Sequence, residues 1–75
     1  MGKKLTEIPF DKIYIGMPVA YEGSATVKGE VIFTKINKAM SFILIEDTNG
    51  AMHSVTGNSS GKLHASRWMF DSQKG

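Results

Sequence analysis

The sequence has no cysteine among its 75 residues. This absence excludes disulfide bonds, thiolate metal ligands and cysteine nucleophiles. Long apolar runs are also missing, because no stretch approaches the roughly 20 residues of a membrane-spanning helix, and the N-terminus has no apolar signal segment. We therefore expect a cytoplasmic protein with no membrane partner.

The chain is also short, at 75 residues and 8.2 kDa, which allows one small domain. A domain of this size buries only about 60% of the surface that its unfolded chain exposes, so a large enclosed substrate cavity is not expected. The sequence predicts a single domain over residues 8–70, between a flexible N-terminal segment, residues 1–7, and a frayed C-terminal tail, residues 71–75. No small-molecule substrate is expected.

Charge is modest, with nine basic and seven acidic side chains and a net charge of +2. The isoelectric point of about 9.1 lies where nucleic-acid binding is worth considering. Much of the basic excess, however, lies in the terminal segments. The folded part then attracts a polyanion only if its cations cluster on one side.

Eight glycines and two prolines divide the chain into short segments, which is typical of short strands joined by tight turns. Asn49-Gly50 lies between two apolar runs and predicts a hairpin turn. With these as the two loop residues, Leu44 is expected opposite Val55, and Glu46 opposite His53. The sequence therefore predicts two paired strands around residues 40–46 and 52–56.

A second hairpin is predicted with its turn at Asn37-Lys38, which sets Phe33 opposite Phe42. The two registers agree on one apolar face, the expected interior, because side chains alternate between the faces of a strand. That face carries Val27, Val31, Phe33, Phe42, Leu44 and Val55. The opposite face carries Ile32, Ile43, Ile45 and Met52.

The strand around residues 40–46 is thus apolar on both faces, so another segment must cover the second face. The N-terminal segment is expected to do so through Ile8, Phe10 and Ile13, with one helical turn at residues 10–13. Gly29 is expected opposite Glu46, at the point where the second strand, which precedes the turn at Asn37-Lys38, bends sharply. The remaining elements are a first strand at residues 19–21, a helical turn at residues 62–66 with Leu63 inward, and a last strand at residues 67–70 that closes against the first.

Four short motifs carry a resemblance to a known superfamily. They are Ile15-Gly16-Met17-Pro18-Val19, Gly29-Glu30-Val31-Ile32, Phe42-Ile43-Leu44-Ile45-Glu46-Asp47 and Leu63-His64-Ala65-Ser66. With them the chain resembles the Src-homology-3-like barrels, especially the KOW and Tudor types. The resemblance implies an all-β, small five-stranded barrel with a short helical turn before the last strand, and for the KOW type it implies a nucleic-acid ligand.

A truncated OB-like barrel is the alternative fold. Gly29-x-Val31, Phe42, Asn49-Gly50 and His53 also resemble the front half of RNA-binding OB domains. That fold needs a helix and two more strands after its third strand. Only 20 residues follow Val55, which leaves too little chain.

Catalytic and metal-binding patterns are weak. The two histidines, His53 and His64, lack the ligand spacing of known metal sites. Ser54 follows His53 in a strand and points to the opposite face, so the two cannot act as a dyad. No glycine-rich phosphate loop precedes a helix. The sequence therefore predicts a non-enzymatic protein with no catalytic residues, no metal site and no cofactor.

Basic residues at two expected loops suggest a binding surface. Lys35 and Lys38 flank one hairpin tip, while Lys62 and Arg67 lie in the last connection. Loops of a small barrel can rise from one rim, and four cations there suit phosphate contacts. Trp68 is a candidate stacking surface. The first hypothesis is therefore a binding module for DNA or RNA.

The second hypothesis is a protein-interaction module, such as an adaptor or a phage-type inhibitor of a host complex. Its surface would be an apolar groove left open if the N-terminal segment does not cover the second face. The expected residues of that groove are Ile32, Ile43, Ile45 and Met52.

Overall fold

The structure, a computed structural model of the chain, describes residues 3–23, 26–64 and 66–71. It is all-β, as the sequence predicts, with five strands and two short 3-10 turns in the described ranges. The turns are η1 (Leu5–Glu7) and η2 (Phe10–Lys12). The strands are β1 (Pro18–Tyr21), β2 (Lys28–Ile36), β3 (Ser41–Asp47), β4 (Met52–Gly57) and β5 (Trp68–Phe70).

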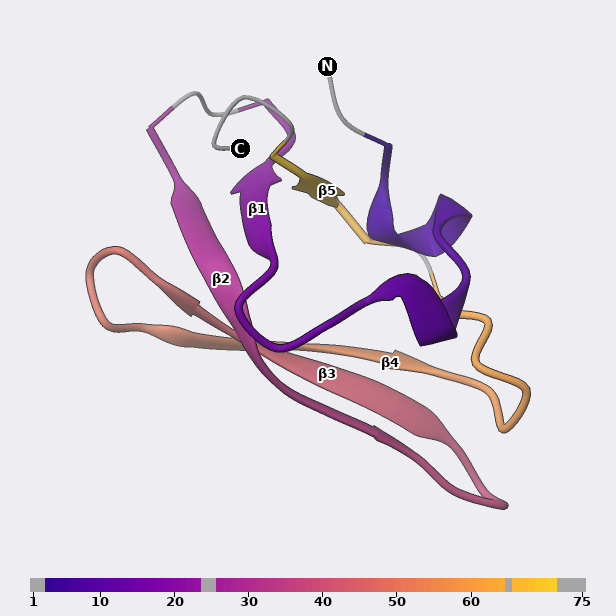
Figure 1. The fold of residues 1–75 in the computed structure, drawn as a ribbon. Coiled ribbons are helices and arrows are strands. Elements are labelled where there is room, and N and C mark those ends of the chain that lie inside the picture. The colour runs from indigo at the N-terminus through magenta and orange to yellow at the C-terminus, as the bar shows by residue number, and fades with distance from the viewer. Residues whose placement is uncertain (1–2, 24–25, 65, 72–75) are drawn as a thin grey trace.

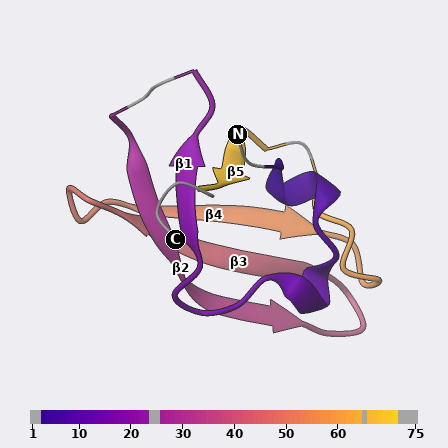
Figure 2. The same ribbon diagram turned by 45° about the horizontal axis from the view of Figure 1, so that its top comes forward.

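The strands form one antiparallel sheet in the order β4-β3-β2-β1-β5, curled into a half-barrel (Figure 1). β5 pairs with β1, with Val19 opposite Phe70 and Tyr21 opposite Trp68. This confirms the predicted closure of the last strand against the first. β1 and the start of β2 turn away from the layer formed by β3 and β4, as Figure 2 shows.

β2 is the strand that carries this bend. Its first residues pair with β1, and residues 29–36 pair with β3, with an irregularity in register between Val31 and Phe33. A Cβ atom added to Gly29 would lie 2.5 Å from the backbone oxygen of Glu46. Glycine therefore allows the close approach of β2 and β3 at the bend, as predicted.

The hairpin between β3 and β4 has a register one residue away from the predicted one. Its loop has three residues, 48–50, because the N–H of Asp47 donates to the carbonyl of Ala51 and Gly50 takes a φ of +85°. The Asp47 carboxylate accepts the N–H groups of Asn49 and Ala51, at 2.9 Å each. This side chain favours the longer loop over the predicted two-residue turn.

The hairpin between β2 and β3 also differs from its prediction. Asn37 opens a four-residue connection, because its N–H donates to the Met40 carbonyl and its side-chain oxygen accepts the N–H groups of Ala39 and Met40. Phe33 consequently lies opposite Leu44 rather than Phe42.

The one-residue shift between β3 and β4 exchanges the two faces of β3 relative to Val55, because side chains alternate with a period of two. The shift between β2 and β3 is two residues, so Phe33, Phe42 and Leu44 still share a face. Ile43 and Ile45 are fully buried, whereas Phe33 is 41% exposed and Phe42 and Leu44 are only half-buried. The predicted interior is therefore wrong for Phe33, Phe42 and Leu44, and correct for Val31 and Val55. The core consists of Leu5, Ile13, Met17, Val19, Val31, Ile43, Ile45, Val55, Leu63 and Trp68, with Val27 packed against it among others.

The N-terminal segment covers the Ile43 and Ile45 face, as predicted. Ile13 is buried, and Ile8 and Phe10 pack against the core. The cover begins earlier than expected, because Leu5 is fully buried and the N–H of Phe70 donates to the Lys3 carbonyl. The prediction of a flexible segment is thus wrong for residues 3–7, while residues 1–2 lie outside the described ranges.

The C-terminal predictions hold in part. Leu63 is buried as expected, but it forms a β-bridge with Gly57. The described residues of 62–66 are not helical, so the predicted helical turn is wrong there, and Ala65 lies outside the described ranges. Asp71 is buried and its N–H donates to the Pro18 carbonyl, so it belongs to the fold. The rest of the predicted tail, residues 72–75, is not described.

Candidate nucleic-acid interface

The turn between β2 and β3 and the loop that follows β4 lie side by side at one end of the molecule (Figures 1 and 2). Lys38 and Ser59 line one shallow hollow there together with Ile36. Lys62 lines a neighbouring hollow that also includes Ile36 and two carboxylates, Glu7 and Asp11. The structure therefore brings Lys38 and Lys62 to the same end, which we call the lysine end.

Hydrogen bonds shape the loop that carries Lys62. The Asn58 side-chain oxygen accepts the N–H groups of Ser60 and Lys62 and the Ser60 hydroxyl, and the Ser41 hydroxyl donates to the Asn58 carbonyl. Gly61 has a φ of +94°, and a Cβ atom there would lie 2.8 Å from Cβ of Phe10. Polar side chains and one glycine thus hold the loop against η2.

Lys35 lies on the face of β2, β3 and β4 opposite the core, which we call the outer face. It stands opposite Phe42, which in turn stands opposite Thr56. Arg67 lines a hollow of about 270 Å³ with Thr56 and His64, alongside β4. The four predicted cations therefore do not form one compact rim, since Arg67 lies beside β4 and apart from the hollows at Lys38 and Lys62.

All four predicted cations are exposed and available. Lys35, Lys38, Lys62 and Arg67 make no ion pair within the described residues. Two other cations are paired, with Lys4 3.3 Å from Glu22 and Lys28 3.5 Å from Asp71, while Lys3 and Lys12 are exposed and make no ion pair within the described residues. Unpaired exposed cations are the groups that can replace counterions on a phosphate backbone.

Trp68 does not offer the predicted stacking surface. Its side chain is 4% exposed and belongs to the core. The ring packs edge-on against Tyr21 and tilted against His53, with ring centroids 5.1 Å apart in each case. These partners come from β1 and β4, so the tryptophan fills the space between the two ends of the sheet.

The predicted protein-binding groove is likewise wrong. Ile43 and Ile45 are fully buried beneath the N-terminal segment and cannot meet a partner. Ile32 is half-buried, and Met52 is 53% exposed on the outer face, opposite Glu46.

Sequence reasoning missed the aromatic pair on the outer face, in which Phe33 is exposed and Phe42 is half-buried. The ring centroids of Phe33 and Phe42 lie 5.8 Å apart with an interplanar angle of 42°. Both were expected inside, because the register was built on a two-residue turn. The aspartate immediately before Thr48-Asn49-Gly50 was the signal of a longer loop, since its side chain bonds the loop backbone.

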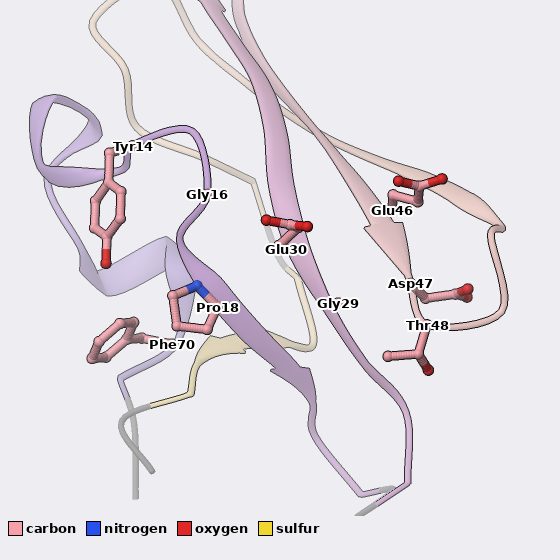
Figure 3. Close-up of a pocket in the computed structure, with 9 residues that line it drawn as sticks. All are labelled: Tyr14, Gly16, Pro18, Gly29, Glu30, Glu46, Asp47, Thr48 and Phe70. Carbon is pink, nitrogen blue, oxygen red and sulfur yellow. The ribbon is translucent and has the colours of Figure 1, made fainter. Parts of the chain in front are cut away.

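The opposite end of the molecule is acidic. A cleft of about 430 Å³ lies there, with Tyr14 and Phe70 on one side, Glu46 and Asp47 on the other and Glu30 between them (Figure 3). Glu30 and Glu46 are direct cross-strand neighbours, which places two like charges together. This end repels phosphate groups.

His53 and Asp47 form a hydrogen-bonded pair at the hairpin between β3 and β4. His53 stands opposite Ile45, so the predicted pair with Glu46 is wrong; its Nε2 lies 2.8 Å from Oδ2 of Asp47. This hydrogen bond, with that from the Ala51 N–H, lowers the pKa of Asp47 below its ordinary value. Among the described residues, no group of three or more potential ligands is placed to hold a metal ion.

No helix in the described part of the chain is long and apolar enough to cross a bilayer. The sequence was compared with protein-family models and with curated proteins, and the fold with solved structures. None of the three comparisons finds a match.

Proposed function

We propose that this chain is a non-enzymatic binding module, a small β-barrel that contacts DNA or RNA through four cations. The cations are Lys35, Lys38, Lys62 and Arg67. The observation that carries the proposal is that these side chains are exposed and without an ion pair in the described residues, while Glu30 and Glu46 gather at the far end. Exposed cations without an ion pair supply the contacts that phosphate groups require.

The resemblance to KOW-type barrels supports the same ligand. An antiparallel sheet in which β5 returns beside β1 agrees with the Src-homology-3-like arrangement expected from the sequence motifs. A nucleic-acid ligand also agrees with the cytoplasmic location expected from the sequence.

The test is a salt titration of binding to labelled 12-nucleotide DNA and RNA, single-stranded and duplex, read by fluorescence anisotropy. Four phosphate contacts give a slope of log K against log salt of about −2.8 on a single strand and about −3.6 on a duplex. On a single strand this is a loss of about fifty-fold between roughly 50 and 200 mM salt. We expect K35Q/K38Q to flatten the slope by about 1.4 to 1.8.

The matched control is K3Q/K4Q, which removes the same charge beside β5. Lys3 is exposed, and Lys4 makes only a surface ion pair with Glu22, so the fold should tolerate the change. Equal slopes for both double variants would show that binding follows net charge alone. Absence of binding to every probe at low salt would reject the proposal.

A protein-interaction module, whether an adaptor or a phage-type inhibitor, is the second candidate. The observation in its favour is that Phe33 and Met52 expose 41% and 53% of their surface on the outer face. Here F33D/M52D should abolish the capture of a specific partner protein, whereas K35Q/K38Q should not. A wild-type protein that captures a partner and binds no nucleic acid would favour this candidate.

A further inference from the structure

The outer face presents its residues in rows that cross β2, β3 and β4. Paired residues on neighbouring strands share a face, so Phe33, Leu44 and Ser54 form one row. Lys35, Phe42 and Thr56 form the next row, towards the lysine end. The two phenylalanines are thus diagonal neighbours on one patch, with a cation beside them.

The aromatic patch is accessible. Phe33 is 41% exposed on the part of β2 that pairs with β3 beyond the end of the β1 pairing, and its ring lies against the half-buried Phe42. The N-terminal segment, which covers apolar surface in this fold, packs on the opposite face of the sheet. Exposed rings on a sheet are surfaces on which unpaired bases stack.

The cations beside the aromatic patch favour a negatively charged ligand. Lys35 lies at one end of the Phe42 row, and Arg67 lies beyond its other end, in the hollow that it shares with Thr56 and His64. Strands are about 4.8 Å apart, so Lys35 and Thr56 are separated by about 10 Å across the sheet. Cations therefore flank the aromatic patch on both sides along this row.

The carboxylates at the acidic end limit the direction in which a ligand with phosphates can cross the outer face. Glu30 and Glu46 form the row beyond Phe33, and Met52 completes that row. A ligand with phosphates that ran along the strands would pass over this carboxylate pair. A ligand that crosses the strands along the Phe42 row avoids it and meets cations at both ends.

Resting on the nucleic-acid function proposed above, we infer that the preferred ligand is single-stranded. Two or three nucleotides cross the outer face, with bases stacked on Phe33 and Phe42 and phosphates near Lys35 and Arg67. A duplex supplies phosphates to the cations but keeps its bases paired and stacked on one another. The aromatic patch therefore adds affinity for a single strand alone.

The experiment compares F33L with Y14L, using a labelled 12-nucleotide strand and its annealed duplex. Tyr14 is the matched control because it is 53% exposed but lines the acidic cleft. We expect wild type to prefer the single strand, and F33L to lose roughly five-fold or more in affinity for it. The salt slope should stay unchanged in F33L, because no cation is removed. Y14L and duplex binding should both remain at wild-type levels.

Two results would overturn the inference and leave the proposed function intact: equal affinity for strand and duplex, or an F33L protein that binds the strand as wild type does. Absence of binding to either probe would instead reject the proposed function. A wild-type dimer in sedimentation equilibrium that F33L dissociates, without change in binding, would assign the patch to a second copy and also overturn the inference.

Side-chain NMR gives a second measurement that needs no substitution. Addition of the single strand should shift the ring protons of Phe33 and Phe42, while those of the buried Trp68 stay in place. Ring shifts confined to Tyr14 or Phe70 would place the ligand in the acidic cleft and contradict the proposed site.

Discussion

Alanine substitution at neighbouring positions of β3 tests which face of the sheet is the core, and hence which face is free to bind. Ile43 is fully buried, whereas Leu44 is half-buried on the outer face. Removal of the Ile43 side chain leaves a cavity and should cost about 2–5 kcal/mol. Leu44→Ala should cost about 1–2 kcal/mol, because much of that side chain is already in water.

The difference is large for a protein of this size. A chain of 75 residues has an expected free energy of unfolding of about 4–11 kcal/mol. Ile43→Ala thus removes a large share of it, and Ile43→Val, at about 0.5–1.5 kcal/mol, serves where the alanine variant does not fold. The measurement is urea unfolding, followed by the fluorescence of the single tryptophan. A Leu44→Ala variant less stable than Ile43→Ala would refute the register and the outer face with it.

Two further predictions concern backbone and loop contacts. Gly57→Ala should destabilise the fold by about 2 kcal/mol or more in the same assay, because the new Cβ would clash with the Lys62 carbonyl oxygen. Unchanged stability would show that the loop is not held there. Asp47→Asn should destabilise the protein near neutral pH, since the pKa of Asp47 is lowered by the His53 hydrogen bond and by the Ala51 N–H. A carboxyl group whose pKa is lowered in the folded state stabilises the fold above about pH 4. This stabilisation disappears as the pH falls through the pKa of the folded state. The urea midpoints of the wild type and of Asp47→Asn should therefore converge in acid. A difference that persists at low pH would contradict this origin.

The sequence predicted which segments pair, but it could not set the registers. Residues 42–45 of β3 are apolar without interruption, so either face fits the interior and the hydrophobic pattern does not choose between them. The choice depends on the loop, where the Asp47 carboxylate bonds the backbone and Gly50 adopts a positive φ. A turn of one more residue then places Ile43 rather than Leu44 opposite Val55, which exchanges the faces of β3.

Part of the candidate site was also predictable from the sequence. The exposed state of the four cations follows from their positions in or beside loops, and needs no register. The environment of Trp68 could not be foreseen, because its ring partners Tyr21 and His53 are distant in the sequence and meet it only when the sheet curls.

The register also connects the fold to its proposed function. In the predicted register the phenylalanines were core and the isoleucines were the open surface, so any ligand would have met only aliphatic groups. In the structure Ile43 and Ile45 are buried, and the exposed Phe33 and the half-buried Phe42 lie on the outer face beside Lys35. Aliphatic side chains bury apolar area without further specificity, whereas aromatic rings beside a cation also offer stacking to an unpaired base. The same one-residue difference that places Ile43 in the core therefore supplies the outer face with the groups that a single-stranded ligand requires.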